Sequence, residues 1–151
     1  MRMLSLLLLP ALLAACTPMA DPPATIPPSA DRVMAAPAGF PVATYTTTIA
    51  AADIPAGAPA DAAAQLVGAW TIAFGNNGHA LVTFNGRQVV DAPFTVNGNE
   101  LVLTEDTGEY ACNSTARYTW HATATELHLT KVEDACNGRA LVLTKHALVR
   151  R

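Results

Sequence analysis

Short alternations of apolar and polar residues occupy the chain from Gln65 to Arg151. Asn-Gly, a pair suited to the positive φ angles of tight hairpin turns, occurs four times between them. A proline inside the third alternation, Pro93, predicts a bulge or a bend there. Together the alternations and turns predict eight strands, at Leu66–Phe74, His79–Phe84, Gln88–Val96, Glu100–Thr104, Glu109–Ala111, Thr115–Ala122, Glu126–Val132 and Ala140–Val149.

Eight short antiparallel strands favour an all-β fold, a small eight-stranded up-and-down barrel, because closure removes exposed strand edges. The interior of such a barrel is just wide enough to be filled by side chains or to hold one small ligand. The candidate residues for lining a ligand site are large side chains on the apolar faces of the strands. They are Phe84, Phe94, Tyr118, Trp120 and Leu129.

The chain before Gln65 has a different composition. Nine of the protein's eleven prolines lie between residues 17 and 64, mixed with Ala, Thr and Ser. Such a segment cannot bury enough apolar surface to offset its ordering entropy, so we expect a disordered tether over residues 16–64 and a barrel domain over 65–151. Within the tether, Val42–Ala50 ("VATYTTTIA") is rich in β-formers and is a candidate edge strand for the domain or for a partner.

The N-terminus has the layout of a secretory signal peptide. Arg2 precedes an apolar run from Met3 to Leu13, which is too short to span a membrane. The next residues, Leu13-Ala14-Ala15-Cys16, resemble the bacterial lipobox. The resemblance implies that residues 1–15 are removed and that Cys16 carries fatty chains such as palmitate, which anchor the protein to a membrane. Thr17, in place of Asp, favours the outer membrane of a Gram-negative cell envelope, with the protein facing the periplasm.

Charge and motifs exclude several functions. The net charge is −3 and no basic run is present, so nucleic acid is not an expected partner. Ser114 lies in no nucleophile elbow, and neither metalloprotease nor phosphate-loop motifs occur. The carboxylate pairs Glu105-Asp106 and Glu133-Asp134 fall at predicted turns, where solvated acids are far commoner than catalytic ones. We therefore expect a protein that is not an enzyme and that needs no cofactor.

Three cysteines, an odd number, remain to be explained. Assigning Cys16 to lipid leaves Cys112 and Cys136 as a pair in an exported domain, where disulfides form and persist. A catalytic thiol pair is the alternative, but it requires a low thiol pKa, and only Arg117 and Arg139 are cations near the two cysteines in sequence. The prediction is a structural disulfide.

Two histidines lie between these cysteines. His121 and His128 fall in neighbouring strands of one predicted hairpin, directly opposite or diagonal according to the turn register. Both lie on the face away from Trp120, and Glu126 shares that face. Because a tight zinc site needs three or four ligands, we expect a solvated outer face and no metal site.

The barrel segment resembles a known family. Gly68-Ala69-Trp70 is similar to the Gly-x-Trp motif of lipocalins and their relatives, the calycins, and "RYTWHATATELHLTKVEDACNGRALVL" is similar to a pattern in bacterial lipocalin-like domains. The resemblance implies that Trp70 plugs one barrel end and that an arginine near the last strand packs across it. Arg150 is favoured for that role over Arg139 and Arg151.

A second resemblance competes with the first. The segments "TFNGRQV" and "FTVNGNELVLTED" are similar to META-domain envelope lipoproteins, although the Gly-Cys-Asn-x-Tyr core of that family is missing. Three functions follow from these resemblances. The first is a membrane-anchored module that binds a small apolar ligand; the second is a structural or envelope-stress interaction protein with a filled core and a protein partner. The third is a protease-inhibitor-like barrel.

Overall fold

The computed structural model describes residues 39–151, which build one β-barrel. The predicted signal peptide, the lipid-bearing Cys16 and the first part of the tether lie outside the described residues. The elements of the described part are β1 (Thr44–Ile49), a 3-10 helix η1 (Ala51–Asp53), α1 (Ala60–Leu66), β2 (Gly68–Phe74), β3 (His79–Phe84), β4 (Arg87–Asn97), β5 (Glu100–Leu103), β6 (Ala116–Ala122), β7 (Glu126–Glu133), α2 (Asn137–Thr144) and β8 (Leu148–Arg150).

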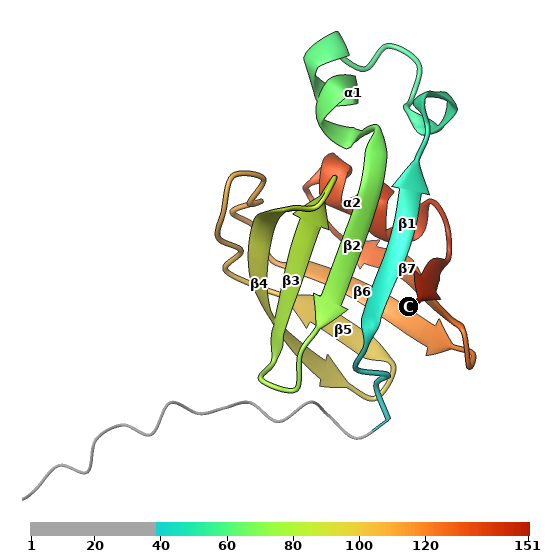
Figure 1. Ribbon diagram of the computed structural model, residues 1–151. Coiled ribbons are helices and arrows are strands. Elements are labelled where there is room, and N and C mark those ends of the chain that lie inside the picture. The colour runs from blue at the N-terminus through green and yellow to red at the C-terminus, as the bar shows by residue number, and fades with distance from the viewer. Residues whose placement is uncertain (1–38) are drawn as a thin grey trace, which may run out of the picture. The chain divides into compact units, whose positions relative to one another are not determined.

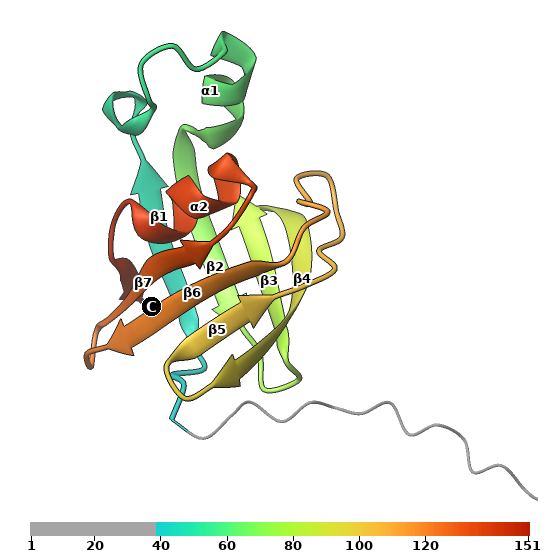
Figure 2. The ribbon, with the colours of Figure 1, turned by 180° about the vertical axis from the view of Figure 1, so that it is seen from behind.

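The eight strands form a closed antiparallel barrel in chain order. Each strand pairs with the next, and β8 closes the barrel against β1 through the pairs Tyr45–Arg150 and Thr46–Val149. Figures 1 and 2 show α1 and α2 at the same end of this barrel. The predicted all-β up-and-down barrel is confirmed.

The first strand comes from the segment predicted to be tether, so the predicted domain boundary at Gln65 is wrong. Residues 44–49 alternate between inward and outward positions: Tyr45, Thr47 and Ile49 are buried, and β1 pairs with β2 along its whole length. The barrel therefore includes the Thr-rich stretch that the sequence indicated only as a possible edge strand. It is not an edge, because it is hydrogen-bonded on both sides.

Two predicted strands near the C-terminal half are also wrong. Glu109–Ala111 lies in the loop between β5 and β6. The first half of Ala140–Val149 belongs to α2, and only Leu148–Arg150 is a strand. The apolar run of α2 is too short for periodicity to separate a helix from a buried strand. Its Ala140, Val142 and Leu143 are buried, as one face of a packed helix.

The hairpin turns and the bulge have local causes. Gly78, Gly86 and Gly98 all have positive φ, as the Asn-Gly pairs predicted, whereas the fourth pair begins α2. The bulge expected at Pro93 lies instead at Val89: Val82 faces Val90 but Thr83 faces Gln88, which leaves Val89 as the extra residue of β4.

One end of the barrel is closed by Phe40, the second described residue. Its side chain is 5% exposed and its ring packs against Phe74, Phe94 and Trp120, with ring centroids 5.0, 5.7 and 5.3 Å away. A hydrogen bond from the Tyr45 hydroxyl to the Pro41 carbonyl, 2.7 Å long, holds the same stretch. The described chain therefore enters the domain through an aromatic plug, at the end of the barrel opposite to α1 (Figure 1).

Within residues 39–151, no helix has both the length and the apolar character needed to cross a membrane.

Candidate functional site: a cavity at the helical end of the barrel

A cavity of about 950 Å³ opens at the helical end and reaches into the barrel. Its mouth is formed by the segment Ile54–Pro59, by α1 and by α2. The volume falls within the range of pockets that hold small molecules. The inner wall consists of inward-facing apolar residues of β2 to β5: Trp70, Ile72, Phe74, Ala80, Val82, Val90, Ala92 and Leu103.

The local sequence explains why space remains here. Ala80 on β3 faces Ala92 on β4, so two neighbouring strands present the smallest side chains to the interior. On the other side of the cavity, α2 contributes Ala140 at the start of its buried face. Small residues on facing elements leave a gap that larger side chains would fill.

Asp53 joins the two sides of the mouth. One of its carboxylate oxygens accepts a hydrogen bond from the Ala50 N–H at 2.9 Å and lies 2.9 Å from Nε2 of His146, just beyond α2. The contact with His146, followed by the bond from Ala50, lowers the pKa of Asp53. The contact connects η1, which precedes the Ile54–Pro59 segment, to the C-terminal end of α2.

Trp70 lies in the wall of the cavity. It is 4% exposed, its indole N–H donates to the Leu66 carbonyl at 2.8 Å, and its ring packs on Phe84 and Tyr110. The arginine expected to pack across it lies elsewhere. Arg150 is exposed, and its backbone lies opposite that of Tyr45 where β8 pairs with β1. Phe40 fills the other end of the barrel.

None of the five predicted ligand-lining residues borders the cavity. Phe94 and Trp120 pack against Phe40, which occupies the space where a ligand was expected. Phe84 packs against Trp70, while Tyr118 and Leu129 are buried in the core. The prediction is wrong because no sequence pattern marked a single phenylalanine in a proline-rich segment as part of the core.

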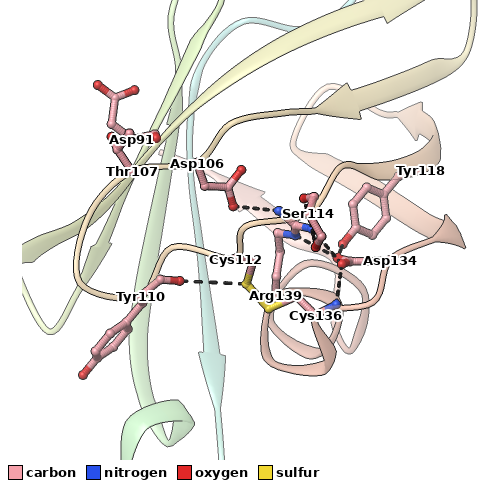
Figure 3. A network of polar contacts seen from close by, with 10 residues as sticks. All are labelled: Asp91, Asp106, Thr107, Tyr110, Cys112, Ser114, Tyr118, Asp134, Cys136 and Arg139. Carbon is pink, nitrogen blue, oxygen red and sulfur yellow. Dashed lines mark hydrogen bonds and ion pairs between the residues drawn. A yellow bond between two sulfur atoms is a disulfide. The ribbon is translucent and has the colours of Figure 1, made fainter.

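A buried ionic network lies beside the cavity (Figure 3). The Arg139 guanidinium donates to Asp134 at 2.9 and 2.8 Å, to Asp106 Oδ2 at 2.6 Å and to the Ser114 carbonyl at 2.8 Å. The Tyr118 hydroxyl donates to Asp134, which also accepts from the Cys136 N–H at 2.8 Å. Asp106 and Asp134 are therefore not the solvated turn acids that the sequence indicated: their side chains are 2% and 0% exposed.

The network shifts the pKa values of its members. Burial by itself would raise the pKa of Asp134, but hydrogen bonds from Arg139, Tyr118 and the Cys136 N–H lower it below its ordinary value. Burial would likewise lower the pKa of Arg139, and its two carboxylate partners raise it instead. Burial, and then the bond to Asp134, raises the pKa of Tyr118. The network thus holds one cation and an ionised Asp134 away from water.

The predicted disulfide between Cys112 and Cys136 is present, with Cα atoms 6.0 Å apart. It ties the β5–β6 loop to the start of α2, next to the bonds that Arg139 makes to the same loop (Figure 3). Both cysteines border the cavity. The bridge and the ionic network therefore fix the same side of the cavity.

The two histidines lie directly opposite each other on β6 and β7. Their rings are stacked, with centroids 4.4 Å apart, and His128 Nε2 lies 3.1 Å from Glu126. Among residues 39–151 no group of three or more side chains is arranged to hold a metal ion.

Comparison with known proteins adds no name to this fold: no protein-family model, curated protein or solved structure matches the chain significantly.

Proposed function

We propose that the protein is a non-catalytic binding module that holds a small, mainly apolar ligand in the cavity at the helical end of its barrel. One observation carries the proposal: the interior is filled at the Phe40 end, yet at the other end an apolar space of about 950 Å³ opens between α1, α2 and the strands. An apolar hollow gains from a ligand that replaces poorly bound water.

We further propose that Cys16 anchors this module in the bacterial envelope, at the outer membrane. The lipobox resemblance supports the anchor. The described chain enters the barrel at the Phe40 end, whereas the cavity opens at the opposite, helical end. Substituting Cys16→Ser should leave unlipidated precursor; a normally cut, soluble product would contradict this part of the proposal.

Tryptophan fluorescence tests the binding proposal, because the chain has two tryptophans and only Trp70 borders the cavity. With an uncharged naphthylamine dye as the probe, energy transfer from tryptophan to the dye should fall more in the Trp70→Phe variant than in Trp120→Phe. The reverse result would place the dye at the Phe40 end. Absence of binding to the wild type would refute the proposal.

A filling variant supplies the second test. Ala92→Leu adds three carbons inside the cavity, whereas Thr95→Leu places the same leucine side chain on the exposed face of the same strand. If the space is open, Ala92→Leu should weaken dye binding and leave stability within about 1 kcal/mol, while Thr95→Leu changes neither. If the core is filled, Ala92→Leu costs about 1–3 kcal/mol through overpacking. That outcome would favour an interaction protein without a ligand.

A further inference from the structure

Only one of the two carboxylate oxygens of Asp106 accepts a hydrogen bond from a described residue. Its Oδ2 accepts from Arg139 at 2.6 Å, whereas Oδ1 is buried and has no partner among the residues that the structure describes. In Figure 3 the second oxygen is turned away from Arg139. A buried acceptor without a donor is costly and calls for one from outside the protein.

Asp106 also lies in the wall of the cavity, to which the apolar Leu103 of β5 contributes as well. The side chain is 2% exposed, so bulk water does not solvate it. The strands β2 to β5 supply apolar contacts in the cavity wall, and Asp106 adds a hydrogen-bond acceptor to the same wall. A molecule that fills the cavity therefore meets one buried acceptor as well as an apolar wall.

The charges around this acceptor favour a donor over an anion. The buried network contains one cation, Arg139, and two carboxylates, Asp106 and Asp134. Of the other charged residues in the cavity wall, Glu109 is exposed and paired with Arg87, and Lys131 is exposed to solvent. The buried part of the site therefore has an excess of negative charge.

From this arrangement we propose that the ligand is an apolar chain or ring that ends in a hydrogen-bond donor, and that this donor binds Oδ1 of Asp106. We expect an amine to bind more tightly than a hydroxyl at this position. This inference rests on the proposed function and adds the chemical class of the ligand. The apolar part lies against Ile72, Ala80 and Ala92, and the donor completes the set of bonds around Asp106. An ammonium group is preferred because hydrogen bonds between charged groups are the stronger ones.

The test compares three probes that share one chain: dodecylamine, dodecanol and dodecanoate, each below its micelle-forming concentration. They compete with the naphthylamine dye on the full-length protein. The amine should bind about tenfold or more tightly than the carboxylate, with the alcohol between them. If the carboxylate binds best, Lys131 rather than Asp106 selects the head group, and the inference is overturned.

The matched variants are Asp106→Asn and Glu109→Gln, which remove one negative charge each from the cavity wall. Asp106→Asn should reduce the difference between amine and carboxylate to about threefold or less, and Glu109→Gln should leave it unchanged. Asp106 also borders a smaller surface hollow with Ser114. If Oδ1 is hydrated from that hollow, the wild type will show no head-group preference, which overturns the inference.

Each failure can be told apart. If the dye does not bind to the protein and none of the three probes binds either, the proposed function fails. If all three probes bind equally well, the binding module stands and only the role of Asp106 is refuted. The wild-type series decides the question even if Asp106→Asn does not fold.

Discussion

Substituting Phe40→Ala tests whether the chain before β1 belongs to the folded domain. Phe40 is 5% exposed and contacts three aromatic rings at 5.0–5.7 Å. Burying a phenylalanine contributes about 1.5–3 kcal/mol, and each aromatic pair adds about 0.5–1.5 kcal/mol. Large-to-small changes at such sites cost about 3–5 kcal/mol, which agrees with the lower part of that sum. We therefore expect about 3–4 kcal/mol of destabilisation.

Urea unfolding of the full chain, followed by circular dichroism and tryptophan fluorescence, measures this change. Trp120 packs edge-to-face against the Phe40 ring, so the fluorescence emission of Trp120 should also shift in the folded variant. The control is Val132→Ala, which removes an apolar side chain that is 54% exposed and should cost less than about 0.5 kcal/mol. A Phe40→Ala variant as stable as this control would show that residues before β1 are tether, as composition alone predicts.

Three further predictions concern the disulfide, the ionic network and the histidine pair. Replacing Cys112 and Cys136 together by Ala should lower the free energy of unfolding by about 3–3.5 kcal/mol, because the bridge closes a loop with a sequence separation of 24; equal midpoints in urea would contradict this. The Arg139→Met variant leaves two buried carboxylates without their cation and should lose about 3–5 kcal/mol at pH 7. In the wild type the lowered pKa of Asp134 means that its contribution is present above the ordinary aspartate pKa and is lost as the pH falls through the folded value. The deficit of Arg139→Met should therefore shrink towards acid pH, and a deficit that is constant with pH would refute the electrostatic explanation. Adding zinc should not shift the melting temperature, because His121, His128 and Glu126 are not arranged as a metal site; a rise of several degrees would refute that.

The strand pattern and its turns could be predicted because their causes are local. His79–Phe84 has its predicted bounds, and β2, β4 and β7 differ from the prediction by one or two residues at their ends. Three Asn-Gly pairs form turns because asparagine and glycine adopt positive φ at little cost. The sequence placed the two histidines in one hairpin, either opposed or diagonal, and the structure has them opposed. The disulfide could be predicted from the count of cysteines.

The site could not be predicted in the same way. The cavity depends on which element covers each barrel end, and that is a property of the closed barrel. Phe40 fills the end where ligand residues were expected, and α2 covers the other end with an apolar run that reads equally well as a strand. The part of the sequence that pointed nearest to the site was the stretch "DACNGR" within the lipocalin-like segment, which contains Asp134, Cys136 and Arg139.

The sequence by itself determined an antiparallel barrel, its strands β2 to β7 and one disulfide, because two-residue alternation and turn chemistry act over a few neighbours. Only the tertiary structure decided that Thr44–Ile49 is the first strand, since that segment becomes a strand by closing the ladder between β2 and β8. It also decided that Asp106 is buried, because the arginine that binds it is 33 residues away along the chain. Burial depends on what lies nearby in space, and alternation along a chain does not contain that information.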